Sequence, residues 1–391
     1  MYKIRTYNQI AVRGLERFPR DRYEVSSEIA DPHAILLRSH QLEGAQLSQS
    51  VRAVARAGAG FNNVPVAECT ERGIVVFNTP GANANSVKEL VMAALLLSAR
   101  DIVGGIQFVM SLKGIADEAE LDRLVEAEKK RFKGRELYGK SLGVVGLGAI
   151  GSLVARAALD MGMKVLGFDP AISVDAAWRL PSEVQRMENL PSLFSRSDYV
   201  TLHVPLMAET RGMINEESLR SFRKGSVLLN FARQPIVDTL ALKKCLDDGR
   251  VGLYVADFPV PGLTEHPNVR LTPHLGASTD EAEENCAVMA AEQLVEFLET
   301  GNIRNSVNFP AVNLEPVGGN RIAITNRNVP GMLGQITSLL AERQINVVDM
   351  INKSRGDVAY NLIDVGGDAP DGLVEAIRGI SSVMNVREFV I

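Results

Sequence analysis

The regular alternation of apolar runs and amphipathic segments between Lys140 and His274 constrains the fold more than any other feature. The run SLGVVGLG, rich in β-branched residues, is followed by AIGSLVARAALDMG, whose apolar residues recur at helical spacing. Five more strand-like runs follow: MKVLGFD, YVTLHVP, SVLLNFAR, LYVADF and VRLTPH. Strands that alternate with helices predict a doubly wound parallel sheet, with ligands bound at the carboxyl ends of the strands.

The turn after the first strand carries Gly146, Gly148 and Gly151 in the spacing G-x-G-x-x-G. Such a match is weak alone, and the alternative is a plain glycine-rich turn with a solvated Asp169 at the end of the next strand. Between a strand and a helix the spacing has a physical reason. Gly146 permits a tight turn, Gly148 lets the backbone approach a pyrophosphate, and Gly151 lets helix and strand pack closely. Asp169 would accept both adenosine ribose hydroxyls and repel a 2′-phosphate, which favours NAD over NADP.

Two further strand ends carry groups suited to chemistry. Arg233 ends one strand, and a planar guanidinium suits a bidentate grip on a carboxylate. His274 ends another, and an imidazole that titrates near neutrality suits proton exchange with a hydroxyl. A structural histidine is the favoured interpretation of His274 taken alone. The dinucleotide turn and Arg233 reverse this preference, because NAD can take a hydride while the protein holds the substrate and manages the proton.

The flanking segments predict further domains. The N-terminal runs HAILLRS, VRAVARAGAG and GIVVFNTPG each pass from apolar residues into a small-residue turn, which is typical of parallel strands. After a linker, the last seventy or so residues show the pattern strand–helix–strand–strand–helix–strand, which predicts a separate small α+β domain.

Composition excludes several classes of protein. A net charge of -5 and a pI near 5.7 argue against a general binder of nucleic acid or of anionic membranes. Cys69, Cys245 and Cys286 lie far apart, without metal or disulfide spacing, and suit a reducing compartment. The N-terminus lacks the pattern of a signal peptide, and LVMAALLLSA is too short to span a bilayer. We therefore expect a cytoplasmic protein without a metal site.

Three motifs together resemble the D-isomer-specific 2-hydroxyacid dehydrogenases: GKSLGVVGLGAIG, NFARQPIVDTLAL and NVRLTPHLGAST. RAVARAGAGFNNVPV and GIVVFNTPGANANSVKELV are similar to the D-3-phosphoglycerate dehydrogenase branch of that family. The resemblance covers nearly the whole chain. It implies NAD-dependent oxidation of 3-phosphoglycerate, the first step of L-serine synthesis, by a homodimer or homotetramer. The alternatives are another D-2-hydroxyacid dehydrogenase, such as a hydroxypyruvate or 2-oxoglutarate reductase, and an NADH-sensing regulator without enzymatic activity.

The resemblance also implies two Rossmann-like doubly wound parallel-sheet domains and a ferredoxin-like α+β domain. The substrate domain would comprise residues 1–98 and 276–305, and the NAD-binding domain residues 99–275. A linker at 306–319 would lead to a regulatory domain at 320–391.

The same resemblance makes His274 the acid/base and Arg233 the clamp on the substrate carboxylate and carbonyl. Arg38 and Arg56 are candidates for the substrate's anionic groups, although either could be an ordinary surface cation. The residues that would bind substrate are Arg38, Arg56, Ala57, Gly58, Ala59, Gly60 and Arg233. The residues that would line NAD are Gly146, Gly148, Ala149, Ile150, Gly151, Asp169, His203, Val204, Pro205, Phe231, Ala232, Arg233, Asp257, His274 and Gly276.

This chain departs from the family pattern at one important position. The family usually carries a glutamate that hydrogen-bonds the catalytic histidine, but Val260 or Pro261 stands at that position here. Asp257 or Glu265 would then orient His274, with Asp257 preferred, although Asp257 could instead lie beside the nicotinamide amide. Gln234 also replaces the glycine that commonly follows the arginine, with no consequence that we can derive.

The segment IAITNRNVPGMLGQITSLLAERQINVVDM resembles an ACT domain, a small-molecule sensing module. In related dehydrogenases the effector is L-serine, which implies an effector site at Asn326, Asn328, Gly331 and Asn346. Asn326 stands where a histidine is usual. The alternative is a domain that only dimerises.

Overall fold

The computed structural model describes residues 1–367 and 372–390, and the chain forms two compact units. One unit comprises residues 84–279, and the other joins residues 1–83 to 280–391. The predicted architecture, two parallel α/β sheets and an antiparallel α+β domain, is confirmed. The domain boundaries expected at 98/99 and 275/276 stay predictions. The compact units divide at 83/84 and 279/280 because helix α3 (Ala84–Ala99) packs on α6, β10 and β11 of the central unit.

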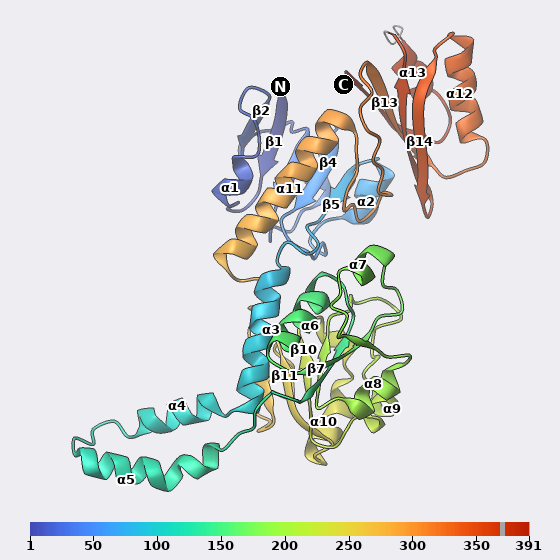
Figure 1. The fold of residues 1–391 in the computed structure, drawn as a ribbon. Coiled ribbons are helices and arrows are strands. Elements are labelled where there is room, and N and C mark those ends of the chain that lie inside the picture. The colour runs from blue at the N-terminus through green and yellow to red at the C-terminus, as the bar shows by residue number, and fades with distance from the viewer. Residues whose placement is uncertain (368–371, 391) are drawn as a thin grey trace. The chain divides into compact units, whose positions relative to one another are not determined.

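The central unit, residues 84–279, is built on a seven-stranded sheet in which all neighbouring strands are parallel. The order β12-β11-β10-β9-β6-β7-β8 reverses the direction of winding between β6 and β9. Every residue of β9 and β10 is buried, which explains their continuous apolar runs. The strands are β6 (Ser141–Val145), β7 (Lys164–Phe168), β8 (Gln185–Arg186), β9 (Tyr199–Leu202), β10 (Ser226–Asn230), β11 (Val251–Ala256) and β12 (Val269–Leu271). The helices around them are α6 (Ala149–Asp160), α7 (Val174–Trp178), α8 (Leu190–Arg196), α9 (Glu216–Arg220) and α10 (Thr239–Asp247), with α3 (Figure 1).

One level row of paired residues crosses this sheet near its carboxyl edge. Each residue in the row is the backbone partner of the next, because the strands are parallel and in register. From one side of the sheet to the other the row runs Leu271, Ala256, Asn230, Leu202, Val145 and Phe168. The residues that leave these six strands therefore start from the same level.

A pair of helices, α4 (Ile102–Ser111) and α5 (Glu118–Glu128), stands off the sheet of the central unit (Figure 1). The ring of Phe108 on α4 lies 5.5 Å from that of Phe132 in the turn after α5. Neither helix buries a residue. Large apolar side chains are therefore left exposed on α4 and the end of α3, at Leu96, Leu97, Ile102, Val103, Ile106, Val109 and Met110.

The second unit contains a five-stranded parallel sheet in the order β2-β1-β3-β4-β5. Helix α11 (Asp280–Thr300) packs on this sheet and on α1 (Val12–Leu15), where a Cβ at Gly14 would lie 2.5 Å from that of Ala287. Small residues thus allow the two helices to approach closely. The remaining elements are β1 (Tyr2–Thr6), β2 (Tyr23–Ser26), β3 (Ala34–Leu37), β4 (Ala53–Arg56), α2 (Val66–Glu71) and β5 (Val75–Phe77).

The same unit contains a four-stranded antiparallel sheet in the order β14-β15-β13-β16. All eight residues of β15 are buried, because its side chains enter a hydrophobic core on each face of the sheet. Residues 306–319, predicted to form a linker, bury Phe309, Val312 and Leu314 in the core that this sheet shares with α11. The elements are β13 (Asn320–Arg327), α12 (Met332–Glu342), β14 (Val347–Arg355), β15 (Val358–Val365), α13 (Leu373–Arg378) and β16 (Val383–Val390).

Side chains of the antiparallel sheet hold the end of α11. The last carbonyl groups of a helix have no partner within the helix. The guanidinium of Arg387 donates to the carbonyl oxygens of Phe297 and Leu298, and the buried hydroxyl of Tyr360 donates to that of Gly301 at 2.7 Å. Burial lowers the pKa of Arg387 to about 10, so this side chain stays charged at neutral pH. None of the helices in the described part of the chain combines the length and the apolar character that a bilayer crossing requires.

The contact between Tyr360 and Gly301 predicts a stability effect. Tyr360→Phe leaves the buried carbonyl of Gly301 without its donor, which we expect to lower the free energy of unfolding by about 1–2 kcal/mol. Urea denaturation followed by circular dichroism would measure it. Tyr138→Phe removes a hydroxyl from an exposed ring and serves as the control. Equal denaturation midpoints for the two variants would contradict the prediction.

Candidate functional site

The candidate site lies where the six strands of the level row end. The first residue after each strand continues from the row, at Thr272, Asp257, Phe231, His203, Gly146 and Asp169. The winding reverses between β6 and β9, so Gly146 and His203 flank the crevice in which doubly wound sheets bind their ligands. Register alone therefore brings the predicted cofactor residues to one edge of the sheet.

The glycines of the turn after β6 meet tight steric limits. Gly146 has φ +88°, and a Cβ there would lie 2.7 Å from the carbonyl oxygen of His203. A Cβ at Gly151 would lie only 1.9 Å from the carbonyl oxygen of Gly146. Both positions therefore need glycine for the fold itself.

Gly148 differs, because a Cβ there would meet nothing within 4 Å. Gly148 begins α6, and no side chain caps this helix. The N–H groups of Ala149 and Ile150 in its first turn therefore have no side-chain partner among the described residues. Other helices of the central unit begin with a capping side chain, namely α4, α5, α7, α8, α9 and α10 with Asp101, Asp117, Ser173, Asn189, Asn215 and Asp238. The start of α6 thus has no capping side chain, and the fold does not require glycine at position 148. Both features fit a site for the pyrophosphate of a dinucleotide.

Asp169 stands directly after β7 and is partly exposed. One carboxylate oxygen accepts a hydrogen bond from the N–H of Leu147 at 2.8 Å, and the other from that of Ala171 at 3.0 Å. The carboxylate is thus fixed beside the glycine turn. Its remaining lone pairs can accept ribose hydroxyls.

His203 lies against the glycine turn, because its carbonyl oxygen is the atom that a Cβ at Gly146 would approach most closely. Its Nε2 is 2.9 Å from the hydroxyl of Thr201, whereas Nδ1 is buried without a hydrogen-bond partner among the described residues. Burial lowers the pKa of His203 to about 3, so the ring is neutral at physiological pH. Val204 also packs on Gly146, and Pro205 follows at the surface. A neutral, half-buried ring is suited to lining a cofactor.

Arg233 leaves the end of β10 after two buried residues, Phe231 and Ala232. The guanidinium is exposed and donates to the carbonyl oxygen of Ala232 at 2.7 Å. No carboxylate lies within ion-pair distance of it in the described part of the chain. Its charge is therefore available to a ligand.

His274 sits in a loop after β12 with φ +61°, a left-handed conformation that is rare for residues other than glycine. The side chain is exposed, and its ring lies 5.2 Å from that of Phe258, edge to face. Its ring nitrogens make no hydrogen bond to any described residue. The imidazole therefore projects from the sheet edge with both nitrogens accessible.

Asp257 fixes the loop that carries His274. Its side chain is buried, and its two oxygens accept hydrogen bonds from the N–H groups of Leu275 and Gly276, both at 2.7 Å. The hydroxyl of Thr272 donates to the same carboxylate at 2.6 Å. Asp257 therefore contacts the backbone after His274 and the side chain of Thr272 before it, but not the ring of His274.

Neither Glu265 nor the residue at position 260 supplies the carboxylate expected beside His274. Glu265, the other candidate, is exposed and makes no hydrogen bond to a described residue. Val260, at the position of the usual glutamate, is buried in the core of the central unit. In this structure no carboxylate contacts the imidazole of His274, within the described residues.

In the second unit, the predicted substrate residues gather at the carboxyl ends of β3 and β4. Arg56 Nε donates to the carbonyl oxygen of Arg38, and a Cβ at Gly58 would clash with the Arg56 guanidinium. The loop from Ala57 to Gly60 is tied down by Asn78, whose amide donates to the carbonyl oxygen of Ala59. The N–H groups of Ala59 and Gly60 have no partner among the described residues. This edge thus carries two guanidinium groups beside two backbone donors.

The predicted effector residues are not equivalent. Asn326 is buried, and its amide is used within the sheet: Nδ2 donates to the carbonyl oxygen of Arg327 and Oδ1 accepts from Asn361. Asn328 and Asn346 are exposed. Gly331 has φ +86° and begins α12, which has no side-chain cap.

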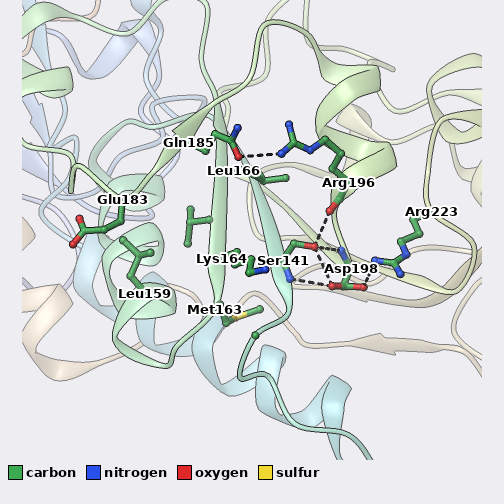
Figure 2. A pocket seen from close by; sticks show the side chains of 12 residues that line it. Ser141, Leu159, Met163, Lys164, Leu166, Glu183, Gln185, Arg196, Asp198 and Arg223 are labelled. Carbon is green, nitrogen blue, oxygen red and sulfur yellow. Dashed lines mark hydrogen bonds and ion pairs between the residues drawn. The ribbon is translucent and has the colours of Figure 1, made fainter.

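A separate cavity of about 540 Å³ lies at the opposite, amino edge of the seven-stranded sheet (Figure 2). Figure 2 shows polar contacts among some of its side chains: Asp198 accepts from Arg223 and Ser141, and Arg196 donates to Gln185. This cavity contains none of the predicted site residues. No group of three or more His, Cys, Asp or Glu side chains in residues 1–367 and 372–390 could hold a metal ion.

Sequence analysis missed three hydroxyl groups that hold the site. Thr272 supports Asp257 from the loop before His274. Thr201 on β9 precedes His203 by two positions, and side chains two apart on an extended strand share a face. That spacing was the available signal. Ser86, whose hydroxyl donates to the carbonyl oxygen of Gly276 at 2.8 Å, is distant in sequence and gave no signal.

Comparison with known proteins agrees with this geometry. Residues 106–276 match the family "D-isomer specific 2-hydroxyacid dehydrogenase, NAD binding domain", and residues 321–380 match the ACT domain family. D-3-phosphoglycerate dehydrogenase of Haemophilus influenzae is 31% identical over 94% of this chain and 89% of its own length. That of Methanocaldococcus jannaschii is 34% identical over 88% of this chain, which spans 63% of the relative.

Among solved structures, the NAD+-bound 3-phosphoglycerate dehydrogenase of Entamoeba histolytica superposes with a TM-score of 0.61 and 26% identity. The match covers 78% of this chain and 98% of the other. The chain thus contains an NAD-binding domain followed by an ACT domain. It belongs to the D-3-phosphoglycerate dehydrogenase family of D-isomer-specific 2-hydroxyacid dehydrogenases.

Proposed function

We propose that this protein oxidises 3-phosphoglycerate to 3-phosphohydroxypyruvate with NAD, the first step of L-serine synthesis. The observation that carries the proposal is the edge of the seven-stranded sheet, where an uncapped α6, Asp169, Arg233 and the His274 loop follow one row of paired residues. Membership of the family supports the choice of substrate.

In the proposed reaction, His274 takes the proton of the substrate's C2 hydroxyl. Its accessible ring nitrogens suit this role, since a general base must reach the proton that it removes. NAD, when bound, accepts the hydride from C2. Arg233 pairs with the substrate carboxylate and polarises the C2 oxygen, because it carries a fixed charge with no internal counter-ion in the described residues.

Asp257 acts in this proposal as a positioning residue. Its buried carboxylate holds the N–H groups of Leu275 and Gly276, and so keeps His274 in its left-handed conformation. A loop fixed from its backbone can orient the imidazole without the glutamate that other family members carry.

The remaining assignments concern the phosphate and the effector. Arg38, Arg56 and the N–H groups of Ala59 and Gly60 would hold the anionic groups of the substrate. At the ACT domain, L-serine would lie at an interface between two such modules, with Asn328, Asn346 and the uncapped N-terminus of α12 as its contacts, whereas the buried Asn326 would support the sheet beneath them.

Two copies of the chain are proposed to pair through the exposed apolar side chains of α3 and α4. An apolar helix that buries none of its own residues is a typical protein interface. We place the reaction in the cytoplasm, since the three cysteines are free and buried, as in proteins of reducing compartments.

The His274 assignment predicts a loss of turnover. Asparagine tolerates the left-handed conformation, so His274→Asn should keep the loop and remove only the base. We expect kcat for 3-phosphoglycerate to fall by about 10²–10⁴-fold while NADH still binds. Steady-state assays with 3-phosphoglycerate and with unphosphorylated glycerate, each with and without L-serine, measure this. If His274→Asn keeps more than a tenth of the wild-type kcat, the role of His274 as the base is refuted. Equal wild-type kcat/KM values for 3-phosphoglycerate and glycerate would refute the phosphate pocket.

The glycine turn predicts a contrast between two substitutions. Gly148→Ala adds a Cβ into open space, so the free energy of unfolding should not change while NAD affinity falls at least tenfold. Gly151→Ala adds a Cβ onto the carbonyl oxygen of Gly146, so it should destabilise the fold by more than about 1 kcal/mol. Calorimetric titration with NADH and thermal unfolding separate the two effects. Unchanged affinity in the Gly148 variant would place the pyrophosphate elsewhere.

The exposed helix pair predicts an oligomer. Replacing Ile106 and Val109 on α4 with aspartate should shift the protein from dimer to monomer in sedimentation experiments, because charges would enter an apolar interface. The same change at the exposed Trp178 and Val174 of α7 is the control. A wild-type monomer at micromolar concentration would contradict the proposed pairing.

A further inference from the structure

The carboxyl edge of the five-stranded sheet holds a charge cluster with an acidic member that the proposed function does not use. The winding of this sheet reverses between β1 and β3, and Arg38 stands directly after β3. Ligands of sheets with this strand order bind at that reversal. Arg56, at the end of β4, is the partner of Leu37 across the sheet. Two guanidinium groups are thus fixed where an anion would bind.

Glu283 enters this cluster from the first turn of α11. Its Oε1 lies 2.6 Å from Nη2 of Arg38, and the two side chains are 39% and 38% exposed. The ion pair is therefore open to solvent and to a ligand. The thiol of Cys286, one turn along α11, is buried within electrostatic range of Arg38, Arg56 and Glu283, and burial raises its pKa. Glu283 and the two arginines thus all lie close enough to this thiol to act on its charge.

The charges of this cluster set up a competition. A phosphate monoester prefers the same planar guanidinium donors that Glu283 now occupies. The carboxylate of Glu283 offsets part of the positive charge that Arg38 would present to a dianion. If the carboxylate stays in place when a phosphate binds, it repels the phosphate, and if it moves away, the ion pair is lost. Either way the carboxylate weakens phosphate binding.

We infer that Glu283 is a specificity-determining residue, a built-in counter-ion that the phosphate of the substrate must displace from Arg38. The inference rests on the proposed function for the identity of the substrate, but the competition between carboxylate and phosphate does not. The backbone of Arg38 is held independently of Glu283, because the side chains of Arg56 and Asn63 both donate to its carbonyl oxygen.

The test is Glu283→Gln in the full-length protein. The amide oxygen can still accept from Arg38, so the substitution removes charge and keeps the hydrogen bond. We expect the KM for 3-phosphoglycerate to fall about two- to fivefold, the range for an exposed ion pair, with kcat changing far less. The dissociation constant of inorganic phosphate, from the phosphate dependence of Tm, should fall by the same factor.

Glu284→Gln is the matched control. Glu284 is the next residue of α11 and forms an ion pair with Arg13. Its replacement by glutamine changes the net charge by the same amount but leaves the ion pair of Arg38 intact. A second control is Glu283→Gln in an Arg38→Gln background, where its effect should be smaller than in the wild type, because the ion pair with Arg38 is already absent. An unchanged or higher phosphate dissociation constant in Glu283→Gln, or an equal effect of Glu284→Gln, overturns the inference. Absence of 3-phosphoglycerate oxidation by the wild type would instead overturn the proposed function, and the phosphate measurement then decides the inference alone.

Discussion

The register of the seven-stranded parallel sheet is the constraint on which the candidate site depends. Parallel strands in register end at one level, so residues far apart in sequence start from the same edge without any long-range contact between side chains. The row from Leu271 to Phe168 does this for six strands. Hydrogen bonds hold the loops that follow the row. The carboxylate of Asp169 accepts from the N–H of Leu147, and that of Asp257 accepts from the N–H groups of Leu275 and Gly276.

In the second unit, a single helix connects two parts of the structure. Helix α11 carries Glu283 and Cys286 near its beginning and is held at its end by Arg387 and Tyr360 of the antiparallel sheet. One helix therefore joins the arginine cluster to the domain that resembles effector-binding modules. The donors that complete its last turn come from β15 and β16, so folding of the antiparallel sheet and order at the end of α11 are physically linked.

The sequence predicted the parts of this protein that follow from periodicity. Alternating runs indicated both parallel sheets and the final α+β domain, and the glycine spacing located the turn after β6. Contacts between residues far apart in the sequence were not predicted, because no periodic pattern encodes them. The carboxylate of Asp257 was expected near the ring of His274, and it holds the flanking backbone instead. The pairing of Arg38 with Glu283 could not be read from residues 245 positions apart. The buried state of Asn326 depends on Asn361, which faces it from another strand.

An experimental structure of the protein with NAD tests the central claim most directly. The sheet edge predicts that the pyrophosphate lies on the N–H groups at the start of α6, with the adenosine ribose on Asp169 and the nicotinamide beside the ends of β10, β11 and β12. A dinucleotide bound in the cavity at the opposite edge, between Ser141 and Arg223, would contradict it.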